Sequence, residues 1–317
     1  MHTGVKITAF VAALAASFGA AYGVGKVVDP VTSPAKPAAH GGHPGGAAKA
    51  DGAGGDAPAG GLQVSEGGYT LDLETRQLEA DKKADLRFVI RDSKGKKVTG
   101  FKREHDKELH LILASRDLTT FRHLHPTRAA DGTWSISAEL PKAGDYRMFA
   151  DFTPKAKDAE NLTLGVDLPV AGDYEPGEPA EESRSSEVDG YKVTLDGRLR
   201  PGAAEEVKLK VTKKGRPVKD LQPYLGAYGH LVALRGGDLA YLHVHPNGEP
   251  GDGTTKPGPE ISFTATAPSE GTYRLFLDFK HEGKVRTAEF TVAAGPDGDS
   301  PKKEEPAEHG DGDSHKH

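Results

Sequence analysis

The sequence predicts an all-β protein made of two tandem antiparallel β-sandwich modules, which follow an N-terminal hydrophobic segment and a flexible linker. One motif occurs twice, as HLILASRDLTTFRHLHP from His110 and as HLVALRGGDLAYLHVHP from His230. Around both motifs, short segments of alternating polarity follow one another at intervals of about ten to twelve residues, separated by turn residues. Neither copy contains a convincing amphipathic helix pattern. These observations favour strands and turns throughout.

Residues 1–28 have the character of a targeting segment. Lys6 is followed by ITAFVAALAASFGAAYGVG, and the next charge is Lys26. An apolar run of about 19 residues is typical of a signal peptide or of an uncleaved membrane anchor. We expect export, and therefore an extracytoplasmic protein that is membrane-anchored or secreted. This segment is the only part that we expect to touch a membrane.

Three further stretches lack the composition of a folded core. Residues 29–64 are rich in Pro, Gly and Ala, residues 173–186 form an acidic linker, and residues 295–317 form a polar tail that contains histidine. Such compositions bury too little apolar surface to offset the entropy of ordering the chain. We expect flexible tethers in all three places.

The two modules are predicted over residues 65–172 and 187–294. Their openings, GYTLDL from Gly68 and GYKVTL from Gly190, correspond, and so do AGDYRMFADF from Ala143 and EGTYRLFLDF from Glu270. The second copy has about seven additional residues in NGEPGDGTTKPGP, where an insertion into a loop costs little. Each module has about 105 residues, the size of an immunoglobulin-like domain.

The repeated motif places three histidines on one face of a predicted hairpin. A turn at Arg116-Asp117 sets His110 opposite His123, and alternation along the strand puts His125 on the same face. Leu111, Leu113 and Leu124 then lie on the other face. The second copy repeats the pattern with His230, His243 and His245, in front of Leu231, Leu242 and Val244.

Three converging imidazoles are the ligands that a histidine-based metal site requires. Neutral imidazole binds copper and zinc, and copper leads in affinity. The prolines that follow each trio predict a position at a sandwich rim, open to solvent. Met148, Asp151 and Asp278 are candidates for an additional ligand. The candidate metal ligands are His110, His123, His125, His230, His243 and His245. We expect His105 and His281, which lack counterparts, to be exposed loop residues.

Composition excludes several other functions. The formal net charge of −6 argues against nucleic acid as a partner. The absence of cysteine excludes disulfides, thiolate metal sites and cysteine nucleophiles. G-x-S-x-G and HExxH motifs are absent, so we do not expect an enzyme, although three histidines and a metal-bound water could in principle hydrolyse a substrate.

The HLI/HLV strand, the HxHP element and the later G-x-Y-x-x-F-x-D strand resemble the YtkA-like bacterial extracytoplasmic proteins. The resemblance covers most of residues 65–294, once in each copy. It implies an extracytoplasmic, immunoglobulin-like sandwich and makes a role in copper handling more plausible. It implies no defined reaction. A blue-copper centre is disfavoured, because such centres use a cysteine ligand that this chain lacks.

Two functional hypotheses follow. In the first, a metal ion, copper or zinc, is bound by each histidine trio for storage, delivery or sensing. In the second, the protein is a cell-surface structural or protein-interaction module with an extracytoplasmic protein partner, and its histidines are structural. Internal repetition alone does not decide between them, because a duplicated motif shows common origin rather than ligand binding.

Overall fold

The computed structural model describes residues 59–178 and 180–295, apart from the side chain of His243. All of these residues fall in one compact unit. The predicted targeting segment, nearly all of the first linker and the polar tail lie outside the described residues. Within the described part, no helix is long and apolar enough to cross a membrane.

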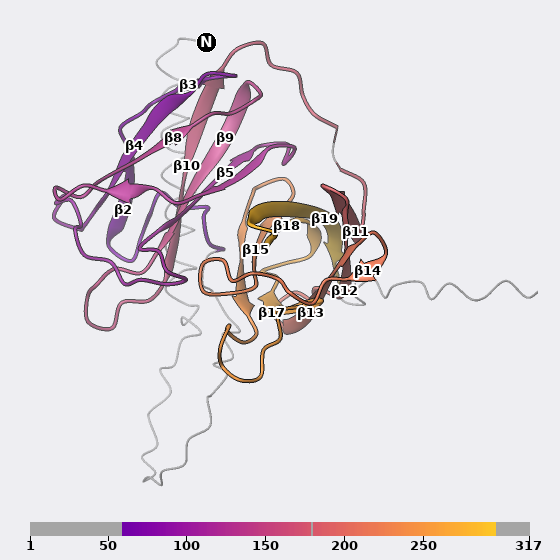
Figure 1. Cartoon of the computed structure of the whole chain (residues 1–317). Coiled ribbons are helices and arrows are strands. Elements are labelled where there is room, and N and C mark those ends of the chain that lie inside the picture. The colour runs from indigo at the N-terminus through magenta and orange to yellow at the C-terminus, as the bar shows by residue number, and fades with distance from the viewer. Residues whose placement is uncertain (1–58, 179, 296–317) are drawn as a thin grey trace, which may run out of the picture. The chain divides into compact units, whose positions relative to one another are not determined.

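The first copy is a sandwich of two five-stranded sheets (Figure 1). One sheet has the order β1 (Ser65–Glu66), β2 (Tyr69–Leu73), β4 (Ala84–Arg91), β8 (Thr133–Ala138) and β7 (Thr127–Arg128). The other has the order β3 (Leu78–Glu79), β10 (Leu162–Ala171), β9 (Gly144–Phe152), β5 (His110–Ser115) and β6 (Phe121–Leu124). All pairs are antiparallel except β3 with β10.

The second copy forms one nine-stranded sheet that folds over on itself. Its order is β11 (Ser185–Val188), β12 (Tyr191–Gly197), β13 (Ala204–Lys213), β17 (Glu260–Thr266), β16 (Tyr241–Pro246), β15 (Gly229–Arg235), β18 (Gly271–His281) and β19 (Lys284–Ala294), with β14 (Arg216–Pro217) beside β13. The sheet is continuous because β16 pairs with β15 at one end and with β17 at the other. The described part contains no helix, and the prediction of two tandem immunoglobulin-like β modules is confirmed.

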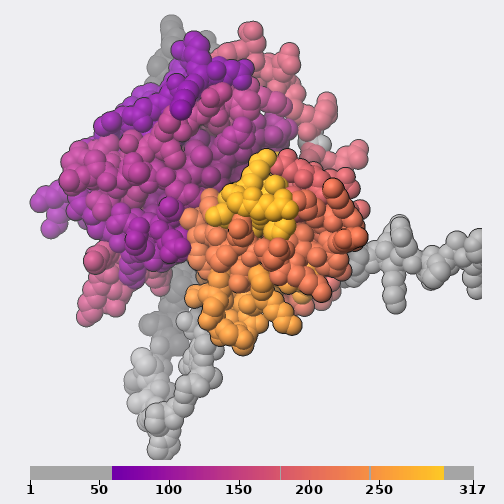
Figure 2. Space-filling model, in the orientation of Figure 1, coloured from indigo at the N-terminus to yellow at the C-terminus, as the bar shows by residue number. Residues whose placement is uncertain are grey.

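Each copy has its own apolar core, built by the inward residues of its strands. In the first copy Leu111 and Leu113 of β5 point into a core that includes Trp134. In the second copy Leu231 and Ala233 of β15 do the same in a core that includes Phe263. The space-filling view shows the surface of the first copy in indigo to pink and that of the second in salmon to yellow (Figure 2).

A third apolar cluster joins residues of both copies. The first copy contributes the opposite face of β5, and the second copy contributes the corresponding face of β15. Its buried members are Ile112, Ala114, Leu118, Phe121, Phe149, Val232, Leu234, Leu239 and Phe276. We call this set the inter-copy cluster. The sequence HLILAS is apolar on both faces because β5 is covered on both.

Candidate metal centre

The hairpin β5–β6 brings the first histidine trio together. Its register pairs Leu111 with Leu124 and Ile112 with His123, two residues away from the predicted pairing. The turn is longer than predicted and uses Leu118 at φ 56°. A shift of two residues preserves the face of every side chain, because strand side chains alternate with a period of two. His110, His123 and His125 therefore share one face, as predicted.

The three imidazoles lie close to one another. One ligand atom from each lies within 4.8 Å of the other two, and His110 Nδ1 is 3.1 Å from His123 Nε2. Two nitrogens on one tetrahedral zinc, at about 2.0–2.1 Å from the ion, are about 3.3 Å apart. The spacing of this pair therefore suits a common metal ion.

The trio is not at an open rim, and that prediction is wrong. The face that carries the histidines continues into the inter-copy cluster, so the second copy covers it. The side chain of His123 is only 3% exposed, and His110 and His125 are half-buried. β6 ends at Leu124, before His125 and Pro126, and the chain then crosses to β7 in the other sheet.

Hydrogen bonds assign the protons on two of the rings. His123 Nδ1 donates to Asp278 Oδ2 at 2.8 Å, which leaves His123 Nε2 with a lone pair. His110 Nε2 lies 3.2 Å from the carbonyl oxygen of Glu104, to which it can only donate. In neutral His110 the lone pair is then on Nδ1, facing the lone pair of His123 Nε2. Two lone pairs at this distance repel each other, and a cation bound between the two nitrogens would remove the repulsion.

A proton is disfavoured as that cation. Burial, together with the smaller effect of the neighbouring His123, lowers the pKa of His110 to about 2. Burial likewise lowers the pKa of His125 to about 3 and that of His230 to about 4. These rings are neutral at pH 7, which is the form that binds metals.

His125 offers the third ligand nitrogen of the candidate metal site. Its Nε2 is buried and has no hydrogen-bond partner among the residues that the structure describes. An unsatisfied buried nitrogen costs about 1–3 kcal/mol, and a metal ion would satisfy it. The donor set therefore fits a zinc or copper ion: three neutral imidazoles with lone pairs, and no thiolate.

The additional candidate ligands have different outcomes. Met148 is fully buried in the core of the first copy and opposite Leu113, so it faces away from the trio. Asp278 contacts the trio, but it does so through His123. Burial raises the pKa of Asp151 to about 6, and its carboxylate accepts a hydrogen bond of 2.7 Å from Asn161.

The strand that carries His243 and His245 of the second trio, β16, pairs with a strand on each side. β16 pairs with β15 only at Leu242 and Tyr241, and from His243 onward it pairs with β17. Leu231 and Leu242 lie in the core behind the strands as predicted, and Val244 packs against it. His245 is exposed and lines the same pocket as His110, His123 and His230. The side chain of His243 lies outside the described structure, so its role as a ligand stays a prediction.

His230 of the second copy lies beside the first trio. Its ring centroid is 6.0 Å from that of His110 and 6.1 Å from that of His123. A pocket of 490 Å³ includes all three rings in its lining. His105 also lines this pocket, and its ring centroid lies 5.0 Å from that of His230. It is an exposed loop residue, which confirms the prediction.

The prediction for His281 is wrong. It ends β18 with 7% exposure, its Nδ1 lies 2.7 Å from the Tyr191 hydroxyl, and its Nε2 donates to Asp220 at 3.0 Å. This is a satisfied structural histidine. A single residue without a counterpart in the other copy carries no pattern from which burial could be inferred.

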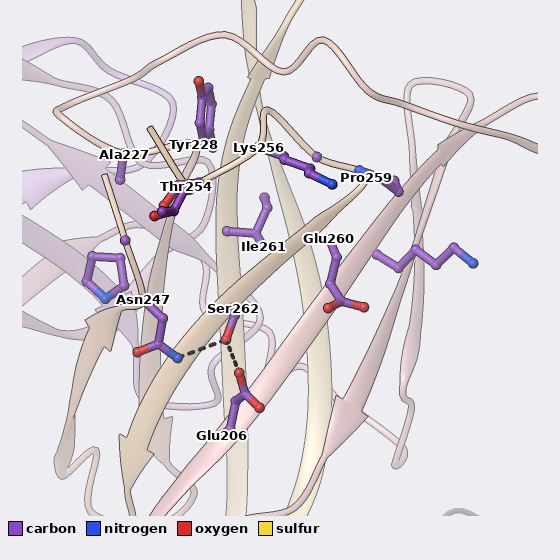
Figure 3. Close-up of a pocket in the computed structure, with 15 residues that line it drawn as sticks. Glu206, Ala227, Tyr228, Asn247, Thr254, Lys256, Pro259, Glu260, Ile261 and Ser262 are labelled. Atoms are coloured by element: carbon purple, nitrogen blue, oxygen red, sulfur yellow. Dashed lines mark hydrogen bonds between the residues drawn. The ribbon is translucent and has the colours of Figure 1, made fainter. Parts of the chain in front are cut away.

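A second pocket, of 660 Å³, lies under the inserted loop of the second copy (Figure 3). The polar side chains of this pocket hydrogen-bond to one another: Asn247 Nδ2 donates to Ser262 Oγ at 2.8 Å, and Ser262 Oγ donates to Glu206 at 2.6 Å. Because these groups satisfy one another, the histidine pocket is the better candidate site.

One protein family matches both copies. Its model, described as a domain of unknown function (DUF8832), matches residues 63–172 and again residues 186–295. The chain belongs to this family. Each copy is thus one DUF8832 module, and the resemblance to YtkA-like proteins stays a prediction. A comparison with curated proteins found no match.

Several solved structures are similar to the tandem DUF8832 modules. The Escherichia coli adhesin FdeC is 15% identical over 76% of this chain, with a TM-score of 0.22. Invasin, a bacterial integrin-binding protein, is 12% identical over 70%, with 0.20, and Yersinia pseudotuberculosis InvD is 14% identical over 73%, with 0.22. The chain spans 66%, 39% and 59% of these proteins, respectively. At such scores the likeness carries no functional inference.

Proposed function

We propose that the protein is an extracytoplasmic metal-binding protein whose first histidine trio binds a copper or zinc ion. The observation that carries the proposal is the cluster of His110, His123 and His125, with ligand atoms within 4.8 Å. The facing lone pairs and the partnerless nitrogen of His125 support it. Imidazole ligands without thiolate suit Cu(II) or Zn(II), and the affinity order favours copper.

The proposed role is binding, for storage, delivery or sensing. The nearest carboxylates are engaged: Asp278 holds His123 and also accepts a hydrogen bond from Thr287 at 2.6 Å, while Asp151 is held by Asn161. Because both carboxylates are held in these hydrogen bonds, a structural role for Asp278 and Asp151 is favoured over acid–base catalysis. The apolar segment after Lys6 supports placement outside the cytoplasm.

A second candidate function is that of a surface interaction or structural module with structural histidines. Its supporting observation is that the rings already contact backbone and side-chain groups: His110 bonds to Glu104 and His123 to Asp278. In that case an extracytoplasmic protein would be the partner, and replacing the trio would leave its binding unchanged.

Calorimetric titration of the full chain with Cu(II) and with Zn(II) separates the two functions. The histidines at both ends are first replaced by serine, so that they cannot mimic a site; these are His2, His40, His43, His309, His315 and His317. We expect tight binding that His123→Ala abolishes and that His281→Gln, a buried histidine elsewhere, leaves intact. Absence of binding in the parent chain would remove the metal proposal and leave the interaction module.

A further inference from the structure

We propose that the metal centre is a single site shared by both copies, in which His230 supplies a fourth imidazole and Asp278 orients His123. This inference rests on the proposed function and deepens it. It implies one metal ion per chain rather than one per module, and a metal ion that fastens the two modules together.

The first support is that the two copies contact each other through equivalent residues. Phe121 stacks on Phe276 with ring centroids 4.0 Å apart and planes at 3°. Tyr241, the counterpart of Phe121, contacts Phe149, the counterpart of Phe276, at 5.9 Å. Such reciprocal contacts are those of an isologous dimer, here built within one chain.

This reciprocity explains why equivalent histidines meet. His110 and His230 occupy the same position in the repeat, 120 residues apart, and their rings lie 6.0 Å apart at 28°. In a reciprocal interface, residues near the local twofold axis contact their own counterparts. A metal site at this position draws ligands from both copies.

The backbone orients both rings in the same way. His110 Nε2 lies 3.2 Å from the carbonyl oxygen of Glu104, and His230 Nε2 lies 3.1 Å from that of Tyr224, the counterpart of Glu104. His230 Nε2 is also 3.0 Å from the carbonyl oxygen of Leu225. Each Nε2 therefore carries the proton, and each Nδ1 keeps the lone pair that a metal needs.

Asp278 connects the second copy directly to the trio. It pairs with His230 across β15 and β18, and its carboxylate accepts the hydrogen bond from His123 of the first copy. Asp278 is 5% exposed, and Thr287 holds its second oxygen at 2.6 Å. In carboxylate–histidine–metal triads of this kind, the carboxylate fixes the tautomer of the ligating histidine and raises its basicity.

The four rings are not equally close. The trio has ring centroids 4.7–5.3 Å apart, whereas His230 stands 6.0 and 6.1 Å from His110 and His123. We therefore expect loading to draw His230 inward and to tighten the contact between the copies. Because its ligands come from both copies, the bound ion would hold the two modules together.

The test compares three variants of the full chain with serine in place of the terminal histidines, using Cu(II) alone and Zn(II) alone. We expect one ion per chain in the parent, and an affinity lowered 10- to 100-fold in His230→Ala and in Asp278→Asn. His281→Gln, a buried histidine of the same copy, controls for loss of stability and keeps the parental affinity. Pulsed electron paramagnetic resonance of the Cu(II) form should lose one coupled imidazole in His230→Ala.

The outcomes separate this inference from the proposed function. If the parent binds one ion, His123→Ala does not, and His230→Ala binds with unchanged affinity and imidazole count, the trio is a site of the first copy alone and sharing is refuted. Two equivalent ions per chain would also refute it. If the parent binds no metal, both proposals fail.

Discussion

Truncation of Phe121 to alanine tests whether the inter-copy cluster stabilises the tandem. The ring is 8% exposed and stacks on Phe276 at 4.0 Å, so nearly all of it is removed from water by the fold. Burial of a phenylalanine side chain contributes about 1.5–3 kcal/mol, and the stacked pair adds about 1 kcal/mol. We expect Phe121→Ala to lower the free energy of unfolding by about 3–4 kcal/mol.

Urea denaturation of the full chain measures this loss. The single tryptophan, Trp134, is buried in the core of the first copy, so its fluorescence follows the unfolding of that copy. Tyr174→Ala is the matched control, because Tyr174 is 59% exposed and its truncation should change stability by less than about 0.5 kcal/mol. A loss below about 1 kcal/mol for Phe121→Ala would refute the conclusion that the two copies support each other.

Three further predictions concern other parts of the chain. Gly165→Ala places a Cβ 2.0 Å from the Gly61 carbonyl oxygen, and thermal melting should show a loss of about 1–3 kcal/mol. His281→Ala leaves the Tyr191 hydroxyl without its buried partner, and urea melts should show a loss of about 1–3 kcal/mol. Burial raises the pKa of Asp117, but hydrogen bonds, led by that from Ser115, outweigh burial and lower it to about 2. The stability from Asp117 is therefore present above pH 3.8 and lost as the pH falls from 3.8 through 2. Asp117→Asn should cost about 1 kcal/mol at pH 7, after allowance for solvent screening, and melts at pH 2 should show a smaller difference from the parent.

The strands and the histidine face follow from the sequence because both depend on local periodicity. Side chains alternate between the two faces of a strand, so assigning HLILAS and FRHLH to strands fixes which residues share a face. A register error of two residues leaves that face unchanged. The turn itself was harder to predict, because Leu118 adopts a positive φ that is rare for a branched residue. No rule of turn composition predicts leucine at that position.

The contact between the copies could not be derived from pattern alone. Ile112 and Ala114 make β5 apolar on its outer face, and this was a signal that something covers it. The sequence does not say what the cover is, because any apolar surface would serve. The same limit applies to Asp278, which bonds to His123, 155 residues away, across that contact. The crossing of β16 from β15 to β17 at His243 depends on how the whole second sheet folds over.

Anomalous diffraction from crystals of the full chain grown with Zn(II) tests the central claim most directly. We predict one strong peak at about 2.0–2.1 Å from His110 Nδ1 and His123 Nε2, with His125 Nε2 as a further ligand. The claim would be contradicted by a map in which the three rings are ordered and the zinc peak is absent there or lies only on surface carboxylates.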